Sequence, residues 1–404
     1  MRVVIKPGPA VGKITAPPSK SMAHRLLISA ALSEGVSIVR GVSSCEDVAA
    51  TLDCMKAMGV KYEKNGEDVR VFGRPAGEFA PSSVLYCRES GSTLRFLIPW
   101  ALACGKTVMF GGAESLFKRP MSVYEKLCRE KGLFFIQDGS SITVKGPLES
   151  GIFNIPGNIS SQFISGLIFA LPTLKGDSKI KIAPPIESRS YIELTLDAVR
   201  SFGIRAEWDD EYTITVPGGQ KYKASDVTVE GDYSGAAFIE ALNLFGGKTR
   251  VEGLKDNSLQ GDRVYKKYYA LLKSGVPTVH IGDCPDLGPV LFSVAAGKFG
   301  GVFTGTKRLK IKESDRAAAM AEELRKFGCL TTVTEDKVVI YPAAFHKPSE
   351  PLFGHNDHRI VMALSVLLTA TGGEIIGAEA VSKSYPDFFK DLRALGIEVE
   401  EYEA

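Results

Sequence analysis

Basic residues gather at the starts of several apolar segments that read as helices. The N-terminus is the end of a helix at which positive charge is least favourable. Lys20, His24 and Arg25 follow Pro18-Ser19 within what reads as the first turn of a helix. A helix N-terminus carries about half a positive charge, so each cation there costs up to about 1 kcal/mol unless an anion binds between them. The pattern fits either a solvated helix start or an anion site.

The same anomaly recurs later in the chain. Arg95 closes Ser92-Thr93-Leu94-Arg95, and Arg359 closes Asn356-Asp357-His358-Arg359. In Lys312-Glu313-Ser314-Asp315-Arg316 two cations stand four residues apart around Glu313, an arrangement that costs a few tenths of a kcal/mol on a bare helix. Each piece alone fits an ordinary surface charge run, but the recurrence favours a set of anion ligands.

Two other groupings carry no site. Gly8-Pro9-Ala10-Val11-Gly12-Lys13-Ile14 lacks one spacer residue and the Ser or Thr of a phosphate-binding P-loop. His355 and His358 suggest a metal, but no Cys or Glu completes a ligand set nearby and Arg359 would repel a cation. We expect no metal and no cofactor.

Helices that end at a glycine and lead into a strand are expected to position these residues. A helix C-terminus favours a residue that tolerates positive φ, and in six places a glycine followed by an apolar residue fits this need. The glycines are Gly59, Gly132, Gly203, Gly275, Gly328 and Gly396. Their spacing predicts six α/β units with a period of roughly 70 residues, one of them shortened.

Four of these units also contain the signal of a β-hairpin. The turn signals are Lys64-Asn65-Gly66, Gln137-Asp138-Gly139, Asp209-Asp210-Glu211 and Glu335-Asp336-Lys337. Six further stretches are apolar on most faces, which indicates buried helices: 26–32, 97–102, 164–171, 238–244, 290–296 and 360–368. The fold class is therefore α/β, with one buried and one amphipathic helix in each unit.

Composition excludes several classes of protein. The chain has 404 residues, 44% of them hydrophobic, and a formal net charge of +2, so it has no global field for nucleic acid or membrane surfaces. Its seven scattered cysteines include no C-x-x-C, and the longest apolar stretches are about a dozen residues, too short to span a bilayer. With no export signal visible, we expect a cytoplasmic protein of two or three domains.

Several segments together resemble the EPSP synthase family, the 3-phosphoshikimate 1-carboxyvinyltransferases, over the full length of the chain. The segments are Pro18 to Arg25, Ser160-Ser161-Gln162, Ser188-Arg189-Ser190-Tyr191, Lys312 to Arg316, Asn356 to Arg359 and Lys383-Ser384-Tyr385-Pro386-Asp387. The resemblance implies two lobes of three βαβαββ units each, with the N-termini of the buried helices facing an interlobe cleft. The expected lobes are 17–228, on the shikimate 3-phosphate side, and 1–16 with 229–404, on the side of phosphoenolpyruvate (PEP) and the catalytic carboxylates.

The implied reaction adds the 5-hydroxyl of shikimate 3-phosphate to C2 of PEP and then expels phosphate. By position, the shikimate 3-phosphate ligands are Lys20, Ser21, Arg25, Ser160, Ser161, Gln162, Ser188, Asp286 and Lys312. The PEP ligands are Lys20, Gly91, Arg119, Gln162, Arg316, Arg359 and Lys383. The resemblance implies Asp286 as the base, Glu313 as the acid that protonates the PEP methylene, and Lys20 as a bridging electrophile.

The sequence departs from the usual family pattern in two places. Glu89-Ser90-Gly91-Ser92 stands where Asn-Ala-Gly-Thr or Asn-Ser-Gly-Thr is common, and Arg308 stands where Asn is common. Glu89 either faces away from the PEP pocket or pairs with a cation such as Arg119. The response to glyphosate, the PEP-competitive inhibitor of the family, stays open.

Two alternatives compete with this interpretation. The sister enolpyruvyltransferase that acts on UDP-N-acetylglucosamine usually has a reactive Cys in the loop before the PEP-binding Arg, whereas residues 111–119 contain none. A non-catalytic or RNA-end-binding protein of related fold would use a basic cleft only to hold phosphates, and would gain nothing from Asp286 and Glu313. We expect a monomer with small-molecule substrates and neither nucleic acid nor membrane as partner.

Overall fold

The chain divides into two compact units in the computed structural model, which describes residues 1–79 and 84–403. Unit 1 consists of Met1–Ser19 with Gly231–Ala404, and unit 2 of Lys20–Glu230. Pro18 and Gly231, next to the two crossings, form a β-bridge within unit 1. The expected lobes place the first crossing three residues earlier, at 17 against Lys20, and the second two residues earlier, at 229 against Gly231.

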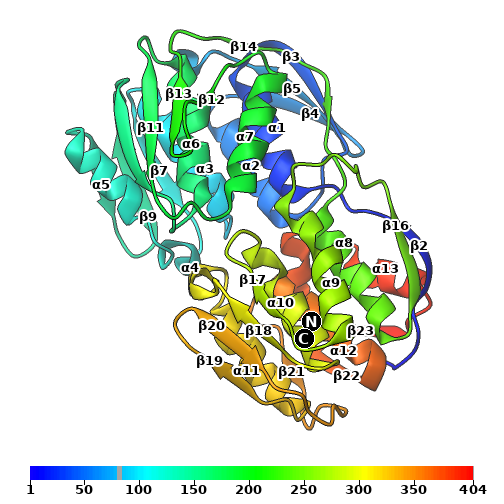
Figure 1. Ribbon diagram of the computed structural model, residues 1–404. Helices are drawn as coiled ribbons and strands as arrows, with labels where there is room; N and C mark the ends of the chain where they lie inside the picture. Colours follow the sequence, from blue (N-terminus) through cyan, green and yellow to red (C-terminus); the bar gives the residue numbers. More distant parts are fainter. Residues whose placement is uncertain (80–83, 404) are drawn as a thin grey trace. The chain divides into compact units, whose positions relative to one another are not determined.

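Unit 2 is built on three sheets that share one layout (Figure 1). In each sheet a parallel pair of strands is followed by two antiparallel neighbours, in the orders β14-β3-β5-β4, β6-β7-β9-β8 and β10-β11-β13-β12, with β15 also pairing with β3. The strands are β3 (Ser33–Arg40), β4 (Lys61–Asn65), β5 (Asp68–Gly73), β6 (Leu85–Tyr86), β7 (Thr107–Gly111), β8 (Phe134–Gln137), β9 (Ser141–Lys145), β10 (Ile152–Pro156), β11 (Ser178–Ala183), β12 (Glu207–Trp208), β13 (Thr213–Val216), β14 (Tyr222–Lys223) and β15 (Val227–Thr228).

Three buried helices fill the interior of unit 2. They are α1 (Lys20–Leu32), α3 (Gly91–Ala103) and α6 (Ser161–Ala170), which are buried along most of their length because they are apolar on most faces. The remaining helices of the unit are α2 (Glu46–Ala57), α4 (Glu114–Phe117), α5 (Ser122–Glu130) and α7 (Arg189–Ser201), with the short 3₁₀ helices η1 (Ala76–Glu78) and η2 (Leu171–Thr173). Helix α3 packs on α6, and α1 packs on α7.

Unit 1 repeats the same layout in two sheets, β21-β22-β1-β23 and β17-β18-β20-β19, and adds the parallel pair β16-β2. Its strands are β1 (Arg2–Ile5), β2 (Val11–Thr15), β16 (Lys248–Glu252), β17 (Thr278–His280), β18 (Gly301–Thr304), β19 (Thr331–Val333), β20 (Lys337–Ile340), β21 (Leu352–Phe353), β22 (Gly373–Ile376) and β23 (Val399–Tyr402).

Helices α8 (Tyr233–Ala241), α10 (Gly288–Ala296) and α12 (His358–Thr371) are the buried helices of unit 1, and α12 packs on both of the others. The more exposed helices are α9 (Tyr265–Ser274), α11 (Arg316–Lys326) and α13 (Phe388–Ala394). The short helices are η3 (Leu242–Phe245), η4 (Gly261–Val264), η5 (Pro285–Leu287), η6 (Lys307–Ile311) and η7 (Ala378–Lys383). Four of the six buried stretches predicted from the sequence fall entirely within buried helices, whereas 164–171 and 238–244 begin in α6 and α8 and run on into η2 and η3, where Asn243 is exposed.

The predicted glycines do lie at helix ends, with one difference in conformation. Five of the six have positive φ, for example 91° at Gly59 and 87° at Gly396, whereas Gly275 has φ 168° and is extended. The following strands begin up to three residues later than predicted, as at Lys61 after Gly59. All four predicted hairpins are confirmed, since β4 pairs with β5, β8 with β9, β12 with β13 and β19 with β20. Among the described residues, no helix is long and apolar enough to cross a bilayer.

Candidate active site

Arg316 is the centre of a buried charge cluster in unit 1. It is the first residue of α11, and its side chain is only 1% exposed. Its guanidinium donates to three carboxylates: Nη1 to Asp286 Oδ1 at 2.7 Å, Nη2 to Glu313 Oε2 at 2.6 Å and Nε to Asp357 Oδ2 at 2.8 Å. The cation at this helix start is therefore compensated by side chains of its own unit.

Asp286 connects three cations. Its carboxylate lies 3.1 Å from Lys312 Nζ and 3.1 Å from Arg359 Nη2, in addition to the bond from Arg316. Burial raises the pKa of Asp286, but the charges of Arg359, Lys312 and Arg316 outweigh burial and hold that pKa well below its ordinary value. Asp286 is thus a carboxylate whose basicity depends on what else these cations bind.

Asp357 was missed as a site residue by sequence reasoning. It caps α12 by accepting from the backbone N–H of Arg359 at 2.9 Å, while its other oxygen accepts from Arg316. A capping role accounts fully for an Asp in this position of a sequence, so only the structure reveals the second role. Asp357 fixes the start of α12 relative to the start of α11.

Lys312 is held close to another cation. Its pKa is lowered to about 8, first by burial and then by the charges of Arg308 and Arg316, against the opposing charge of Asp286. Arg308 itself is buried, and its Nη1 lies 3.4 Å from the carbonyl oxygen of Gly282. The departure at Arg308 therefore has a physical effect, since it makes Lys312 easier to deprotonate.

Lys383 is the PEP ligand predicted furthest along the chain. Its Nζ donates to the backbone carbonyl of Asn356 at 2.7 Å and to the Asn356 side chain at 2.8 Å. The structure thus places Lys383 beside the segment that begins α12 and carries Arg359.

In unit 2, Lys20 opens α1 and forms an ion pair with Asp47 of α2 at 2.7 Å. Both side chains are largely buried, at 14% and 11% exposed. Asp47 was also missed, because an ion pair between residues 27 positions apart on different helices leaves no local sequence signal. The pair fixes the Lys20 ammonium at the beginning of α1.

Arg25 is a buried cation whose partners are oxygens without charge. It donates to Thr195 Oγ1 at 2.8 Å, to the carbonyl of Tyr191 at 3.0 Å and to the carbonyl of Ser21 at 2.6 Å. Burial lowers the pKa of Arg25 to about 10. These bonds fix the orientation of the guanidinium, and none of these partners carries a negative charge to neutralise it.

Gln162 and Gly91 bring two predicted segments together. Gln162 accepts from Arg95 Nη1 at 2.7 Å and donates to Ser92 Oγ at 2.9 Å. A Cβ at Gly91 would lie 3.0 Å from Arg119 Nη1, so the absence of a side chain at Gly91 lets the guanidinium of Arg119 approach the start of α3 closely. Arg95, noted from its position in the sequence, thus joins the predicted residues as a further member of this group.

The predicted serines lie at helix starts. Ser160 caps α6 by accepting from the Gln162 backbone N–H at 3.3 Å, and Ser161 is the first residue of that helix. Ser188 precedes α7 in the left-handed conformation, with φ 57°. Glu89, one of the residues that depart from the usual pattern, accepts a hydrogen bond from Ser115 Oγ of α4 at 3.2 Å.

One cluster of side chains in unit 1 could offer ligand atoms to a metal ion. Contrary to the sequence argument, glutamates do approach His355: ligand atoms of Glu322, Glu323 and His355 all lie within 4.8 Å of one another. However, the fully buried Glu323 already pairs with Lys326 Nζ at 3.0 Å and with His355 Nε2 at 2.9 Å. The ammonium group supplies the charge that an ion would bring, so these residues do not fit a metal.

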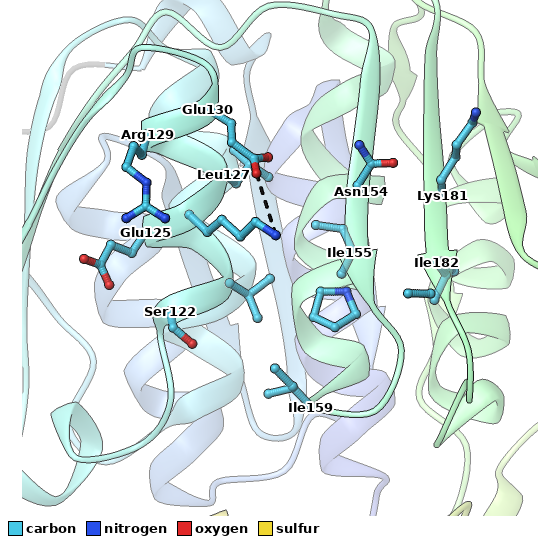
Figure 2. A pocket seen from close by; sticks show the side chains of 14 residues that line it. Ser122, Glu125, Leu127, Arg129, Glu130, Asn154, Ile155, Ile159, Lys181 and Ile182 are labelled. Atoms are coloured by element: carbon cyan, nitrogen blue, oxygen red, sulfur yellow. Dashed lines mark ion pairs between the residues drawn. The ribbon is translucent and has the colours of Figure 1, made fainter.

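A cavity of about 540 Å³ opens on unit 2 between α5 and the strands β10 and β11 (Figure 2). It is lined by apolar side chains such as Leu127, Ile155 and Ile182 and by several charged side chains. None of the predicted site residues lines it. Most of the candidate residues lie instead at or near the starts of α1, α3, α6 and α7 in unit 2, and of η5, α11 and α12 in unit 1, while Arg119 lies between α4 and α5 and Lys383 ends η7.

Comparison with known proteins gives consistent matches along the chain. The family model for EPSP synthase (3-phosphoshikimate 1-carboxyvinyltransferase) matches residues 4–392. The 3-phosphoshikimate 1-carboxyvinyltransferase of Clostridium kluyveri is 36% identical, covering 99% of this chain and 98% of that protein, and that of Clostridium acetobutylicum is 39% identical with the same coverage. The solved structure of EPSP synthase from Acinetobacter baumannii is similar with a TM-score of 0.80 at 26% identity, covering 99% of this chain and 100% of that one.

Proposed function

The chain belongs to the EPSP synthase (3-phosphoshikimate 1-carboxyvinyltransferase) family, and from this premise we propose how its own residues carry out the reaction. The enzyme is a transferase of the shikimate pathway. It moves the carboxyvinyl group of PEP to the 5-hydroxyl of shikimate 3-phosphate and releases phosphate. The UDP-N-acetylglucosamine and RNA-end alternatives lose their support, because family, relatives and solved structures agree on the shikimate reaction.

The proposal rests mainly on the cluster around Arg316. Two carboxylates, Asp286 and Glu313, share one buried guanidinium, and both are acceptors that a pure anion-binding protein would not need. We assign PEP to Arg316 and Arg359, with Arg119, Gly91, Gln162, Lys20 and Lys383 as its further ligands. Arginine suits this role since its planar fork binds carboxylate or phosphate through two parallel hydrogen bonds.

Binding of PEP would change the chemistry of Asp286. A substrate carboxylate competes with Asp286 for Arg359 and Arg316, the cations that hold its pKa low. As those contacts pass to the substrate, burial becomes the dominant influence and the pKa of Asp286 rises. Asp286 then serves as the base that takes the 5-hydroxyl proton, while Glu313 delivers a proton to the PEP methylene and Lys20 stabilises charge at the bridging oxygen.

We assign shikimate 3-phosphate to residues of unit 2 and to residues of unit 1. Its phosphate goes to hydroxyls and cations of unit 2, namely Lys20, Ser21, Arg25, Ser160, Ser161, Gln162 and Ser188. Its ring hydroxyls go to Asp286 and Lys312 of unit 1. The uncompensated charge of Arg25, ringed by hydroxyl and carbonyl oxygens, supports the phosphate assignment.

The decisive experiment is phosphate release from PEP in a coupled assay. We expect release with shikimate 3-phosphate and none with UDP-N-acetylglucosamine, and the reverse would overturn the proposal.

We also propose a cytoplasmic monomer that does not bind nucleic acid. All seven cysteines are free thiols, as a reducing compartment would keep them. Light scattering and RNA titration test these two points.

A further inference from the structure

Asp262 is a buried acid for which the proposed reaction has no use. It lies in η4 and is 3% exposed. Its Oδ1 makes no hydrogen bond with any of the described residues. Burying a carboxyl group with an unsatisfied oxygen is costly, so its presence calls for a physical reason.

Asp262 is linked to Arg359 through one hydroxyl group. Ser234, in the first turn of α8, hydrogen-bonds to Asp262 and accepts from Arg359 Nη1 at 2.5 Å. A serine hydroxyl has a single proton, and because Ser234 accepts from the guanidinium, that proton is directed to the Asp262 carboxylate. The result is a chain of hydrogen bonds from Arg359 through Ser234 to Asp262.

The two ends of the Arg359 guanidinium have different partners. Nη1 bonds to Ser234 and to the backbone carbonyl of Asp286 at 3.2 Å, both of which are fixed groups. Nη2 bonds to the Asp286 carboxylate at 3.1 Å, the contact for which a substrate carboxylate would compete. Nη1 therefore anchors the guanidinium while Nη2 exchanges partners.

We propose that Asp262 is a positioning residue for PEP, which acts through the Ser234 hydroxyl to hold Arg359 Nη1 in place while Nη2 receives the substrate. This proposal rests on the assignment of Arg359 to PEP. A guanidinium that is already oriented loses less conformational freedom on binding, so the effect belongs in the affinity for PEP rather than in the chemical step.

The charge of Asp262 adds a second effect. The groups that face it are Asp232 at the start of α8, Cys284 and Asp286 at η5, and Arg359 of α12. Burial, followed by the charge of Asp286, raises the pKa of Asp262 to about 6, although Arg359 and the Ser234 hydrogen bond oppose the rise. Asp262 is therefore ionised at pH 7.5 and becomes neutral as the pH falls through about 6, which leaves the Arg359 charge less compensated.

The test is a double-mutant cycle on the KM for PEP. We expect Asp262→Ala and Ser234→Ala each to raise this KM about tenfold, and the double variant to raise it no further, because both act through one hydrogen-bonded chain. The kcat and the KM for shikimate 3-phosphate should stay within about threefold of the wild-type values. Asp262→Asn, whose amide oxygen still accepts from Ser234, should recover most of the PEP affinity at pH 7.5.

A matched control is Asp256→Ala, which removes an exposed carboxylate from the same segment. It should change neither KM. The pH profile gives an independent readout: the ratio of PEP KM between Asp262→Asn and the wild type should change as the pH crosses about 6. Because the KM values of Asp262→Asn and the wild type are compared at the same pH, the effect of the titration of the PEP phosphate cancels.

The outcomes separate this inference from the proposed function. If Arg359→Ala leaves the KM for PEP unchanged, the assignment of Arg359 is wrong. If Arg359→Ala raises this KM but Asp262→Ala and Ser234→Ala do not, or if their effects add, the positioning role of Asp262 is wrong. Should Asp262→Ala not fold, Ser234→Ala and the pH profile of Asp262→Asn decide the question, and normal values in both overturn the inference.

Discussion

The Asp286 carboxylate accepts a hydrogen bond from Nη2 of Arg359 at 3.1 Å, although the two residues are 73 positions apart. The proposed base and a proposed substrate ligand therefore neutralise each other within unit 1. Any anion that binds Arg359 competes with Asp286, and any change at Asp286 alters the affinity of Arg359 for anions. Binding and proton transfer are coupled through this single contact.

Removing the negative charge of Asp286 should separate turnover from affinity. We expect Asp286→Asn to lower kcat by roughly 10² to 10⁴-fold while PEP binding holds or improves, because the amide no longer competes as an anion. Steady-state kinetics and calorimetry check the two effects. Asp283→Asn, an exposed carboxylate three residues earlier, is the control. Normal turnover in Asp286→Asn would exclude it as the base.

Glu313→Gln should give the same separation for a different proton. We expect the variant to keep its fold and its PEP affinity, and to lose roughly 10² to 10⁴-fold in kcat, since Gln cannot protonate the PEP methylene. Exchange of the methylene protons with solvent deuterium, followed by NMR, reports this step directly. Exchange at the wild-type rate in Glu313→Gln would show that another group is the acid.

The two PEP arginines should differ in their effect on stability. Arg359→Ala should weaken PEP binding by about 2 kcal/mol or more and leave shikimate 3-phosphate binding largely unchanged. Arg316→Ala should in addition destabilise the fold by about 3 to 5 kcal/mol, because it leaves Asp286, Glu313 and Asp357 without their shared buried partner. Calorimetry with each ligand, and thermal melting without ligand, measure these effects. Equal losses of affinity for both substrates would show that the assignment of these arginines to PEP is wrong.

Lys312 should make substrate binding sensitive to alkaline pH. Because its pKa is lowered to about 8, the ammonium loses its proton as the pH rises through that value. Shikimate 3-phosphate affinity should then fall by up to about tenfold per pH unit. Lys312→Arg should keep binding at pH 9, and Arg308→Asn should move the midpoint upward. The exposed Lys310→Arg is the control, and a wild-type affinity that stays constant up to pH 9.5 would contradict the prediction.

His355 should make the stability of unit 1 depend on pH. The hydrogen bond that His355 Nε2 donates to the Glu323 carboxylate raises the pKa of His355, against the opposing effect of burial. The stabilisation is fully present below about pH 6.5, the ordinary value, and is lost as the pH rises through the raised pKa. We expect His355→Asn to cost about 1 to 2 kcal/mol at pH 6 and much less at pH 9, by thermal melting. The exposed His346→Asn should show no such difference.

Local sequence patterns were sufficient for the elements and for many charged residues of the site. Glycines such as Gly59 stand where the backbone needs positive φ, so the helix ends could be predicted. Gly275 shows the limit, because its extended backbone gives no reason for glycine that the sequence could reveal. The cations at helix starts were found because their local position is unfavourable, which is a signal that does not require the fold.

The carboxylates that compensate these cations could not be predicted in the same way. Asp47 meets Lys20, and Asp262 meets Ser234 and Arg359, only after distant segments pack together. An Asp in the first turn of a helix is ordinary in a sequence, and its burial is a property of tertiary structure alone. The sequence therefore predicts where charge is placed against local preference, while the partners of that charge follow from packing.

The position of β1 has a consequence for synthesis on the ribosome. This strand is made long before both of its partners, since it lies between β22 and β23, with Ile5 opposite Gly373 and Val399. At about 5 to 20 residues per second, the roughly 370 intervening residues take on the order of 20 to 70 s to emerge. The whole of unit 2 is synthesised during this time, so it can begin to fold while β1 is still unpaired. Changes to the first six residues should thus affect the yield of folded protein more than its final stability, because they act on a strand that stays unpaired through most of translation.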